Sequence, residues 1–435
     1  MVLDPYFEPG DGGDNAFTVE APKIKFGAGS LSEIGDDAQA LGMTRVALYT
    51  DPVVADLEPV DIACKSLNAA GIDIAVYDET EVEPTDRSFK AATAFARDGG
   101  FDGFVSVGGG SVMDTAKAAN LYSTYADDFL AYVNAPIGEA KPVPGPLKPH
   151  IACPTTFGTA SECTGIAICD MLELDTKTGI ASARLRPSLG ILDPNSLATL
   201  PRPIIAANGF DVFGHAIESL TARPFSHRPA PENSNLRPLG QGANPYSDLA
   251  CQESIRLIGD NLIAAVNEAD NSATYEPLMF ASMLAGIGFG NAGCHLPHAM
   301  SYAVAGLTRG YSAPGWPSNH PMVPHGISVI VNAPAVFRFT GPACPERHLK
   351  AAQAMGADVS GVALEDAGDV LADRVIDMMR QTDIPNGNGG VGYEESDLEA
   401  LTERAYLQQR LLVNSPLTPE RDQLKELFHD SLRYW

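Results

Sequence analysis

The hydrophobic and polar positions follow one pattern in the first 200 residues of the chain and a different one after them. In the first part, short apolar runs alternate with helix-like segments such as 61–71 and 87–100. The runs typical of strands are RVALYTD (45–51), DIAVYDE (73–79), FDGFVSVGGG (101–110) and HIACPTT (150–156). Strands that alternate with helices form a parallel sheet with helices on its faces. We therefore predict an α/β domain over residues 1–200.

Beyond residue 200 the chain changes to long segments rich in Ala and Leu, and strand-like runs nearly vanish. The segments 206–222, 246–269 and 275–290 have the length and composition of helices. Two stretches rich in Pro and Asn, at 223–245 and 307–321, are typical of long loops, which are often functional inside a compact domain. We predict a second, all-α domain over residues 201–435.

This second part contains a candidate metal site. Asp211 and His215 are four residues apart in DVFGHAIE, so both side chains would leave one face of a helix. His298 lies in another helix-like segment, and His325 precedes an apolar run. One carboxylate and three imidazoles can coordinate a divalent cation and leave room for a substrate oxygen. A lone Asp-x-x-x-His pair is more often an ordinary surface pair, but the two further histidines favour metal binding.

A strand that ends in three glycines and continues as a helix is a second chemical signal. Backbone amides at such a helix start, unobstructed by side chains, suit a pyrophosphate. The positions concerned are Gly108, Gly109, Gly110, Ser111 and Asp114. The spacing is not the usual G-x-G-x-x-G, and the last two residues could instead form a capping box.

Two more features favour a nucleotide in the predicted α/β domain. Thr155, Thr156 and Thr159 follow the strand at 150–156 and could reach a ribose or a phosphate, although an ordinary turn would use the same residues. Asp51 ends an earlier strand, where a carboxylate can accept hydrogen bonds from a ribose and repel a 2′-phosphate. Together these features suggest NAD rather than NADP.

The charge balance narrows the partners. The chain has 29 basic and 55 acidic residues, a formal charge of −26, which argues against nucleic acid and anionic membranes. The seven cysteines are scattered and include no C-x-x-C pair, as expected of free thiols in a reducing compartment. The first twenty residues are acidic and lack an apolar core. We expect a cytoplasmic protein that binds no nucleic acid and no membrane.

In order and separation, GGGSVMDTAK, PTTFGTASE, LDPNSLATLP, FDVFGHAIES and the two histidine segments resemble the iron-dependent (group III) alcohol dehydrogenases. VEPTDRSF (82–89), GIGFGNAGCHLPHAMSY (286–302) and PERHLKAAQAMGAD (345–358) are most similar to the hydroxyacid-oxoacid transhydrogenase branch of that family. The resemblance runs from about residue 15 to the C-terminus. It implies a Rossmann-like nucleotide-binding domain followed by an all-α metal-binding domain, an architecture shared with dehydroquinate synthase.

The resemblance also assigns roles to residues. It implies metal ligands at Asp211, His215, His298 and His325, cofactor contacts at the glycine and threonine turns named above, and NAD selection by Asp51. It implies Fe²⁺, although affinity order alone would favour Zn²⁺. Many members carry a further histidine, suspected of relaying protons, where this chain has Tyr302. His295, one helical turn before His298, could serve instead or could simply be packed.

For the activity, the resemblance implies a transhydrogenase that moves hydride from 4-hydroxybutyrate through NAD to 2-oxoglutarate. The alternative is an NAD-dependent, iron-containing alcohol dehydrogenase that acts on a small primary alcohol or 4-hydroxybutyrate and releases NADH. A lyase resembling dehydroquinate synthase and an inert binding protein are weaker alternatives. We expect a homo-oligomer such as a dimer.

The distal carboxylate of 2-oxoglutarate needs a cationic partner, and arginine binds carboxylates with two parallel hydrogen bonds. Arg228 and Arg237 lie in the long loop 223–245. We predict that one of them binds this carboxylate, with pairing to surface acids as the other interpretation.

Overall fold

The computed structural model describes residues 6, 8–174, 176–268, 270–308, 310–316 and 321–435. The chain forms two compact units, one of residues 21–200 and the other of residues 1–20 with 201–435. The predicted loop at 307–321 lies partly outside the described residues.

The α/β unit is built on a six-stranded sheet in the order β1-β8-β5-β4-β2-β3, and all its pairings are parallel. The strands are β1 (Ile24–Phe26), β2 (Arg45–Tyr49), β3 (Asp73–Tyr77), β4 (Gly103–Gly108), β5 (His150–Pro154) and β8 (Leu189–Leu192). An antiparallel hairpin, β6 (Ile166–Met171) with β7 (Thr176–Ala181), forms a second sheet. The predicted α/β class is confirmed.

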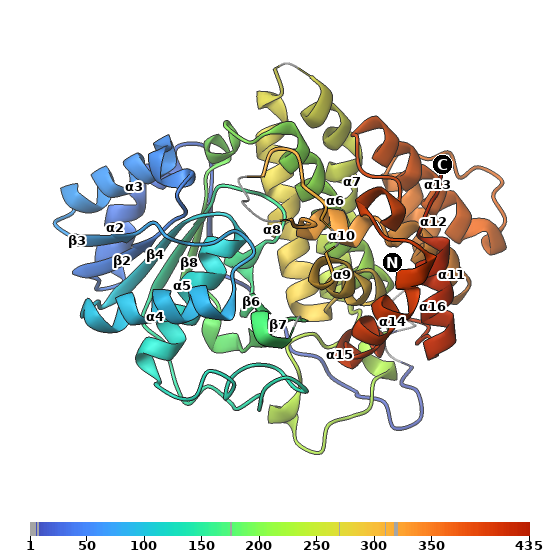
Figure 1. Ribbon diagram of the computed structural model, residues 1–435, viewed down its shortest axis with the longest axis horizontal. Coiled ribbons are helices and arrows are strands. Elements are labelled where there is room, and N and C mark those ends of the chain that lie inside the picture. Colours follow the sequence, from blue (N-terminus) through green and yellow to red (C-terminus); the bar gives the residue numbers. More distant parts are fainter. Residues whose placement is uncertain (1–5, 7, 175, 269, 309, 317–320) are drawn as a thin grey trace. The chain divides into compact units, whose positions relative to one another are not determined.

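Both faces of the large sheet are covered by helices (Figure 1). Val46 and Leu48 of β2 enter an apolar cluster with helices α2 (Ile34–Ala40) and α3 (Glu58–Ala69). Ala47 and Tyr49, the alternate residues, enter a second cluster with α4 (Asp86–Asp98) and α5 (Gly110–Thr124). Successive side chains of a strand point to opposite faces, so a strand covered on both sides is apolar throughout. This burial fixes the register of the strands whose ends carry the candidate nucleotide residues.

The other unit is helical, as predicted, and no strand follows residue 200 in the described ranges. Its helices are α6 (Arg202–Thr221), α7 (Pro245–Asn267), α8 (Tyr275–Ala292), α9 (Leu296–Gly306), α10 (His325–Ile330), α11 (Ala333–Thr340), α12 (Pro345–Ala354), α13 (Ala367–Gln381), α14 (Leu398–Tyr406), α15 (Gln409–Leu412) and α16 (Arg421–Asp430). Helix α6 is almost wholly buried and packs extensively against α7, α8 and α10. It is the central helix of this unit.

The N-terminal segment packs with the helical unit, whereas the sequence analysis assigned residues 1–20 to the α/β domain. Its described aromatic rings explain the difference. Tyr6 stacks on Phe225 with ring centroids 6.2 Å apart, and Phe17 lies 4.8 Å from the same ring. A segment without helical or strand periodicity gives no signal of where two such rings will be buried.

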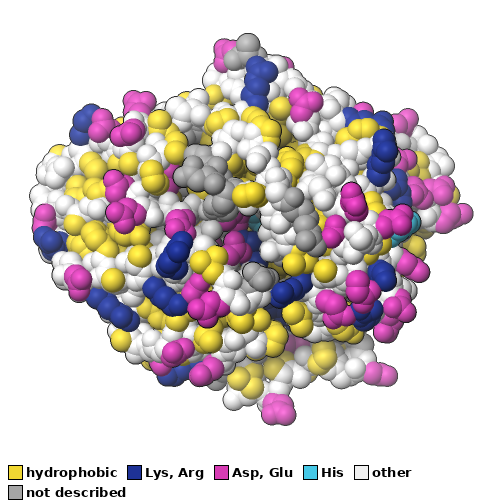
Figure 2. Space-filling view, in the orientation of Figure 1, with side chains coloured by type: hydrophobic (Ala, Val, Ile, Leu, Met, Phe, Trp, Pro, Cys, Tyr) yellow, Lys and Arg dark blue, Asp and Glu magenta, His cyan; other side chains and the backbone are white. Residues whose placement is uncertain are grey.

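No single helix of the described residues is long and apolar enough to cross a membrane, and one pair bent by 102°, 272–292 with 296–306, meets that test only when joined. Acidic side chains are scattered over much of the visible surface (Figure 2). Together with the net charge of −26, this surface repels anions at long range. An anionic ligand therefore depends on local cations.

The partly buried ion pair between Arg347 in α12 and Asp248 in α7 makes a testable contribution to stability. The guanidinium donates to both carboxylate oxygens, at 3.1 and 3.0 Å, and the Tyr6 hydroxyl contacts both side chains. Arg347→Met should lower the free energy of unfolding by about 3 kcal/mol in urea titrations, because it leaves a desolvated carboxylate without its cation. Arg256→Met, which breaks an exposed pair on α7, is the control and should cost much less. Equal losses in the two variants would contradict a special role for the buried pair.

Candidate metal and nucleotide sites

Two glycines of α6, Gly209 and Gly214, let neighbouring helices approach it closely. A Cβ atom at Gly209 would lie 2.2 Å from Leu262 in α7, and one at Gly214 would lie 2.9 Å from Val329 in α10. Gly326, the second residue of α10, is closer still, since its Cβ would lie 2.1 Å from the Ala207 carbonyl oxygen in α6. The start of α10, and with it His325, is therefore pressed against the turn of α6 that precedes Asp211.

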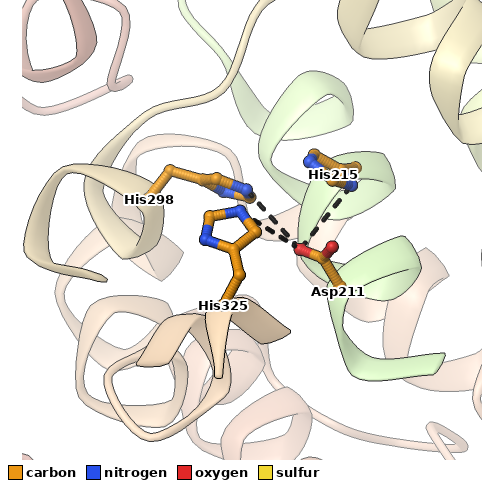
Figure 3. Close-up of side chains that lie close together, drawn as sticks. All are labelled: Asp211, His215, His298 and His325. Carbon is orange, nitrogen blue, oxygen red and sulfur yellow. Dashed lines mark ion pairs between the residues drawn. The ribbon is translucent and has the colours of Figure 1, made fainter. Parts of the chain in front are cut away.

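The four side chains predicted to bind a metal converge in one place, although they come from three helices (Figure 3). Oδ1 of Asp211 lies 3.8 Å from His215 Nδ1, 3.8 Å from His298 Nε2 and 3.6 Å from His325 Nε2. The four ligand atoms all lie within 4.8 Å of one another. Phe289 of α8 stacks on the His215 ring at 4.1 Å and so limits its rotation.

This donor set fits a divalent cation. Atoms about 2.1 Å from a common tetrahedral ion are about 3.4 Å apart, close to the separations observed here. His298 Nε2 is buried and has no hydrogen-bond partner among the residues that the structure describes. The side chain of His325 is 25% exposed, whereas those of Asp211 and His298 are 3% and 6% exposed. One side of the cluster is therefore accessible, as a metal that must also bind a substrate requires.

Glu218 is a site residue that the sequence analysis missed. Its fully buried carboxylate accepts a hydrogen bond from His298 Nδ1 at 2.6 Å and one from the His295 backbone amide at 2.6 Å. Burial raises the pKa of Glu218, but the attraction of His298 and its hydrogen bond outweigh burial, so the pKa lies below its ordinary value. Because Nδ1 carries the donated proton, Nε2 of His298 is left to face the cluster. The available sequence signal was the position of Glu218, one helical turn beyond His215 on α6.

The two residues predicted to be catalytic have different surroundings. His295 is fully buried, with Nε2 2.9 Å from the Thr221 hydroxyl and Nδ1 accepting from the Leu296 amide. Burial lowers the pKa of His295 to about 4. Both ring nitrogens are thus occupied in a neutral imidazole, which favours the packed alternative over a proton relay. Tyr302 lies one helical turn beyond His298 on α9, and its hydroxyl accepts a hydrogen bond from Arg410.

The two arginines predicted to bind substrate are held by groups of the protein itself. Arg237 forms two 2.8 Å hydrogen bonds with Asp14, which corresponds to the alternative of pairing with an acid. Arg228 donates to the Gly240 carbonyl and to Asn414 Oδ1 at 2.8 Å. Both side chains therefore anchor the loop 223–245, and neither is presented to a ligand by this arrangement.

In the α/β unit, the glycine turn and the threonine turn lie against each other. A Cβ atom at Gly110 would lie 2.6 Å from the Thr159 side chain, and one at Gly109 would lie 3.3 Å from Thr156. Thr155 donates its backbone N–H to the Gly108 carbonyl at 3.0 Å. Helix α5 begins after Gly109 with no side-chain cap, so the capping-box alternative is wrong. The Val112 amide donates to the Gly109 carbonyl at 3.0 Å. Helix geometry leaves the amides of Gly110 and Ser111, at the very start of α5, without an acceptor within the helix, which suits a pyrophosphate.

The side chains of Ser111 and Asp114 accept hydrogen bonds that hold these turns in place. Ser111 Oγ accepts from the Glu83 amide at 3.2 Å. Asp114 accepts from the Ser161 hydroxyl at 2.5 Å and from the Ile168 amide at 2.9 Å. The fully buried Lys117 donates to Ser161 and to the Ile166 carbonyl. The geometry gives Asp114 a positioning role and leaves the glycine amides as the candidate phosphate ligands.

Asp51 follows β2, and its Oδ1 accepts from the amides of Val53 and Val54 at 2.9 and 3.0 Å. Oδ2 makes no hydrogen bond within the described residues. One oxygen thus shapes the turn and the other is available to a ribose hydroxyl.

Comparison with known proteins agrees with this arrangement. The family model described as "Iron-containing alcohol dehydrogenase" matches residues 21–194, and "Fe-containing alcohol dehydrogenase family, C-terminal" matches residues 239–432. The chain belongs to the iron-containing alcohol dehydrogenase family. It is accordingly an oxidoreductase that acts on CH–OH groups, and the predicted family resemblance is confirmed.

Named relatives are similar over nearly the whole chain. "Hydroxyacid-oxoacid transhydrogenase, mitochondrial" from Xenopus laevis is 46% identical over 97% of this chain and 92% of its own length. The Homo sapiens protein of the same name is 45% identical over 97% of this chain and 91% of its own. The crystal structure of a 1,3-propanediol oxidoreductase matches with a TM-score of 0.83 and 29% identity, covering 96% of this chain and 100% of that one.

The relatives overturn the expectation of a cytoplasmic protein, because their names place them in mitochondria. The prediction rested on unpaired cysteines and on the composition of the first twenty residues. The presence of free thiols indicates a reducing rather than an oxidising compartment, but it does not indicate which reducing compartment.

Replacing Glu218 tests how the metal ligands are held. Glu218→Gln removes the charge that accepts from His298 Nδ1, so the variant should bind its metal about 10- to 100-fold more weakly while remaining folded. Competition with a chelator, followed by metal analysis, measures this loss. The control is Glu253→Gln, which replaces an exposed carboxylate on α7 and should leave the metal affinity unchanged. A wild-type metal affinity in Glu218→Gln would refute the orienting role of Glu218.

Cofactor choice tests Asp51. Asp51→Asn keeps an oxygen for the amides of Val53 and Val54 but removes the charge that repels a 2′-phosphate. We expect the ratio of kcat/KM for NAD to that for NADP to fall about tenfold or more. An unchanged ratio, with wild-type stability, would mean that this strand end does not contact the ribose.

Proposed function

We propose that this protein is a hydroxyacid-oxoacid transhydrogenase, which moves hydride from 4-hydroxybutyrate to 2-oxoglutarate through bound NAD. The observation that carries the proposal is 45–46% identity over 97% of the chain with relatives of that name. The four-residue cluster and the paired turns supply the parts that such chemistry needs.

The overall reaction is balanced. 4-Hydroxybutyrate loses a hydride from the carbinol carbon and a proton from the hydroxyl, and becomes succinate semialdehyde. 2-Oxoglutarate gains the hydride and a proton at its keto group and becomes 2-hydroxyglutarate. No external oxidant is required, because the two half-reactions balance. A nicotinamide held by the glycine and threonine turns would supply the hydride acceptor for one and the hydride donor for the other.

The side chains have defined tasks in this proposal. Asp211, His215, His298 and His325 hold the cation, and Glu218 fixes the orientation of His298. When bound, a divalent cation favours loss of the hydroxyl proton and polarises the acceptor carbonyl. The glycine-turn amides bind the pyrophosphate, and Asp51 accepts from the ribose. We propose Fe²⁺ because of the family, although Zn²⁺ suits the same donor set.

The second candidate is an NAD-dependent alcohol dehydrogenase that releases NADH at each turnover. The family models and the similarity to 1,3-propanediol oxidoreductase favour it as the broader interpretation. The two candidates differ in whether the cofactor must leave between half-reactions and in whether a 2-oxoacid is the final hydride acceptor. The prediction of a homo-oligomer such as a dimer is independent of this choice.

One assay separates the two activities. The enzyme, loaded with Fe²⁺ and a stoichiometric amount of NAD, is given 4-hydroxybutyrate with and without 2-oxoglutarate. A transhydrogenase should form many equivalents of 2-hydroxyglutarate, with little sustained absorbance at 340 nm. In a second reaction the same substrates are supplied with excess NAD. Continuous formation of NADH there, without 2-hydroxyglutarate, would instead identify the alcohol dehydrogenase.

His325→Ala in the same assay tests the cation site. The variant should lose bound metal and at least 100-fold in activity while keeping its helical content, because the hydrophobic cores do not depend on this exposed edge of the cluster. Metal content is measured on the purified protein, and wild-type content would refute the assignment of His325.

A further inference from the structure

Arg410 is an exposed arginine that lies against a buried tyrosine, Tyr302, on the helix that carries the candidate metal ligand His298. Its Nη2 donates to the Tyr302 hydroxyl at 3.3 Å, and its guanidinium carbon is 5.8 Å from the centre of that ring. Within the described ranges, no carboxylate lies within 4.0 Å of this guanidinium. This differs from Arg237 and Arg347, which are paired with acids in a chain that has 55 of them.

Tyr302 connects Arg410 to the site. It follows His298 by four residues on α9, so the two side chains leave the same face of the helix, about 6 Å apart along the axis. His298 is part of the cluster that faces the accessible edge at His325. Tyr302, which Arg410 contacts, therefore lies one helical turn from a residue of the cluster.

The segment that carries Arg410 is held firmly to the start of α9. Asn414 donates to the Cys294 carbonyl at 3.0 Å and to the Ala292 carbonyl at 3.2 Å, in the turn that leads into the helix. Arg228 in turn donates to Asn414 Oδ1 at 2.8 Å. Leu412, beside them, is fully buried. These contacts fix the backbone at and just after α15, while the exposed guanidinium of Arg410 stays accessible to a ligand beside Tyr302.

The two substrates of the proposed reaction share one feature that a single cation can recognise. In 4-hydroxybutyrate, the carboxylate carbon is three bonds from the carbon that loses hydride. In 2-oxoglutarate, the distal carboxylate carbon is three bonds from the carbon that gains it. A guanidinium at one fixed distance from the reacting carbon would therefore serve both half-reactions, and its planar fork suits a carboxylate.

We propose that Arg410, held by Tyr302, binds the carboxylate that lies three bonds from the reacting carbon of both the donor and the acceptor. The proposal rests on the proposed function and names the residue that selects for acidic substrates. It gives Arg410 the role that the sequence analysis predicted for Arg228 or Arg237. Arg228 acts one step away, by fixing Asn414.

The test measures binding without turnover. 2-Oxoglutarate is titrated calorimetrically into the metal-loaded enzyme with NAD⁺, which holds no hydride to transfer, and the titration is repeated with 2-oxopentanoate, which has a methyl group in place of the distal carboxylate. Arg410→Ala should raise the Kd for 2-oxoglutarate about 10- to 100-fold and change that for 2-oxopentanoate less than about twofold. Arg410→Lys should fall between the wild type and the alanine variant.

Arg380 supplies a matched control, since it is also exposed and its guanidinium carbon lies 5.0 Å from the centre of an aromatic ring, that of Trp435. Arg380→Ala should bind both ligands as the wild type does. Steady-state assays should show the same selectivity, with KM for 4-hydroxybutyrate raised in Arg410→Ala and KM for 1-butanol unchanged.

The outcomes separate the two proposals. Wild-type Kd for 2-oxoglutarate in Arg410→Ala, or equal losses for 2-oxopentanoate, would overturn the role of Arg410 and leave the transhydrogenase proposal standing. A wild-type enzyme that does not bind 2-oxoglutarate would overturn both.

Discussion

The buried helix α6 carries three ionisable side chains, Asp211, His215 and Glu218. They are shielded from water and therefore need polar or charged partners within the protein or its ligand. Each is no more than 4% exposed. Burying such groups costs several kcal/mol unless hydrogen bonds or an ion compensate. Glu218 is compensated by His298 and the His295 amide, whereas Asp211 and His215 face the cluster of imidazoles. The neighbouring helices are arranged around this requirement.

Close packing around α6 converts that requirement into a fixed geometry. Gly326 brings α10 against the backbone of α6, and Gly214 lets Val329 approach the middle of the helix. Any side chain at these points would push the helices apart and move His325 away from Asp211. The same principle operates in the α/β unit, where Gly110 brings the start of α5 against Thr159. In both units, the atoms that would hold a ligand are placed by contacts that only glycine permits.

The two units use different means to hold their candidate sites rigid. The helical unit uses stacked rings and charged hydrogen bonds, such as Phe289 on His215 and Glu218 with His298. The α/β unit uses a buried network in which Asp114 and Lys117 join two turns through Ser161. Groups held in this way lose little conformational freedom when a ligand binds, which favours both affinity and rate.

The sequence by itself determined the class of each unit, the order of its main helices and strands, and the identity of the four cluster residues, because apolar periodicity and helical spacing are local properties of the chain. It did not reveal β1, β8 or the β6–β7 hairpin, which are too short or too weakly alternating. Nor did it reveal the partners of the charged side chains. Arg237 and Arg228 looked available in a long loop, but Asp14 and Asn414, almost two hundred residues or more away in the chain, occupy them. Glu218 gave no comparable signal, because its role depends on His298 in another helix. The role proposed for Arg410 depends in the same way on Tyr302. Long-range packing decides which charged groups can face a ligand and which are paired with other groups of the protein. Only the tertiary structure contains that information.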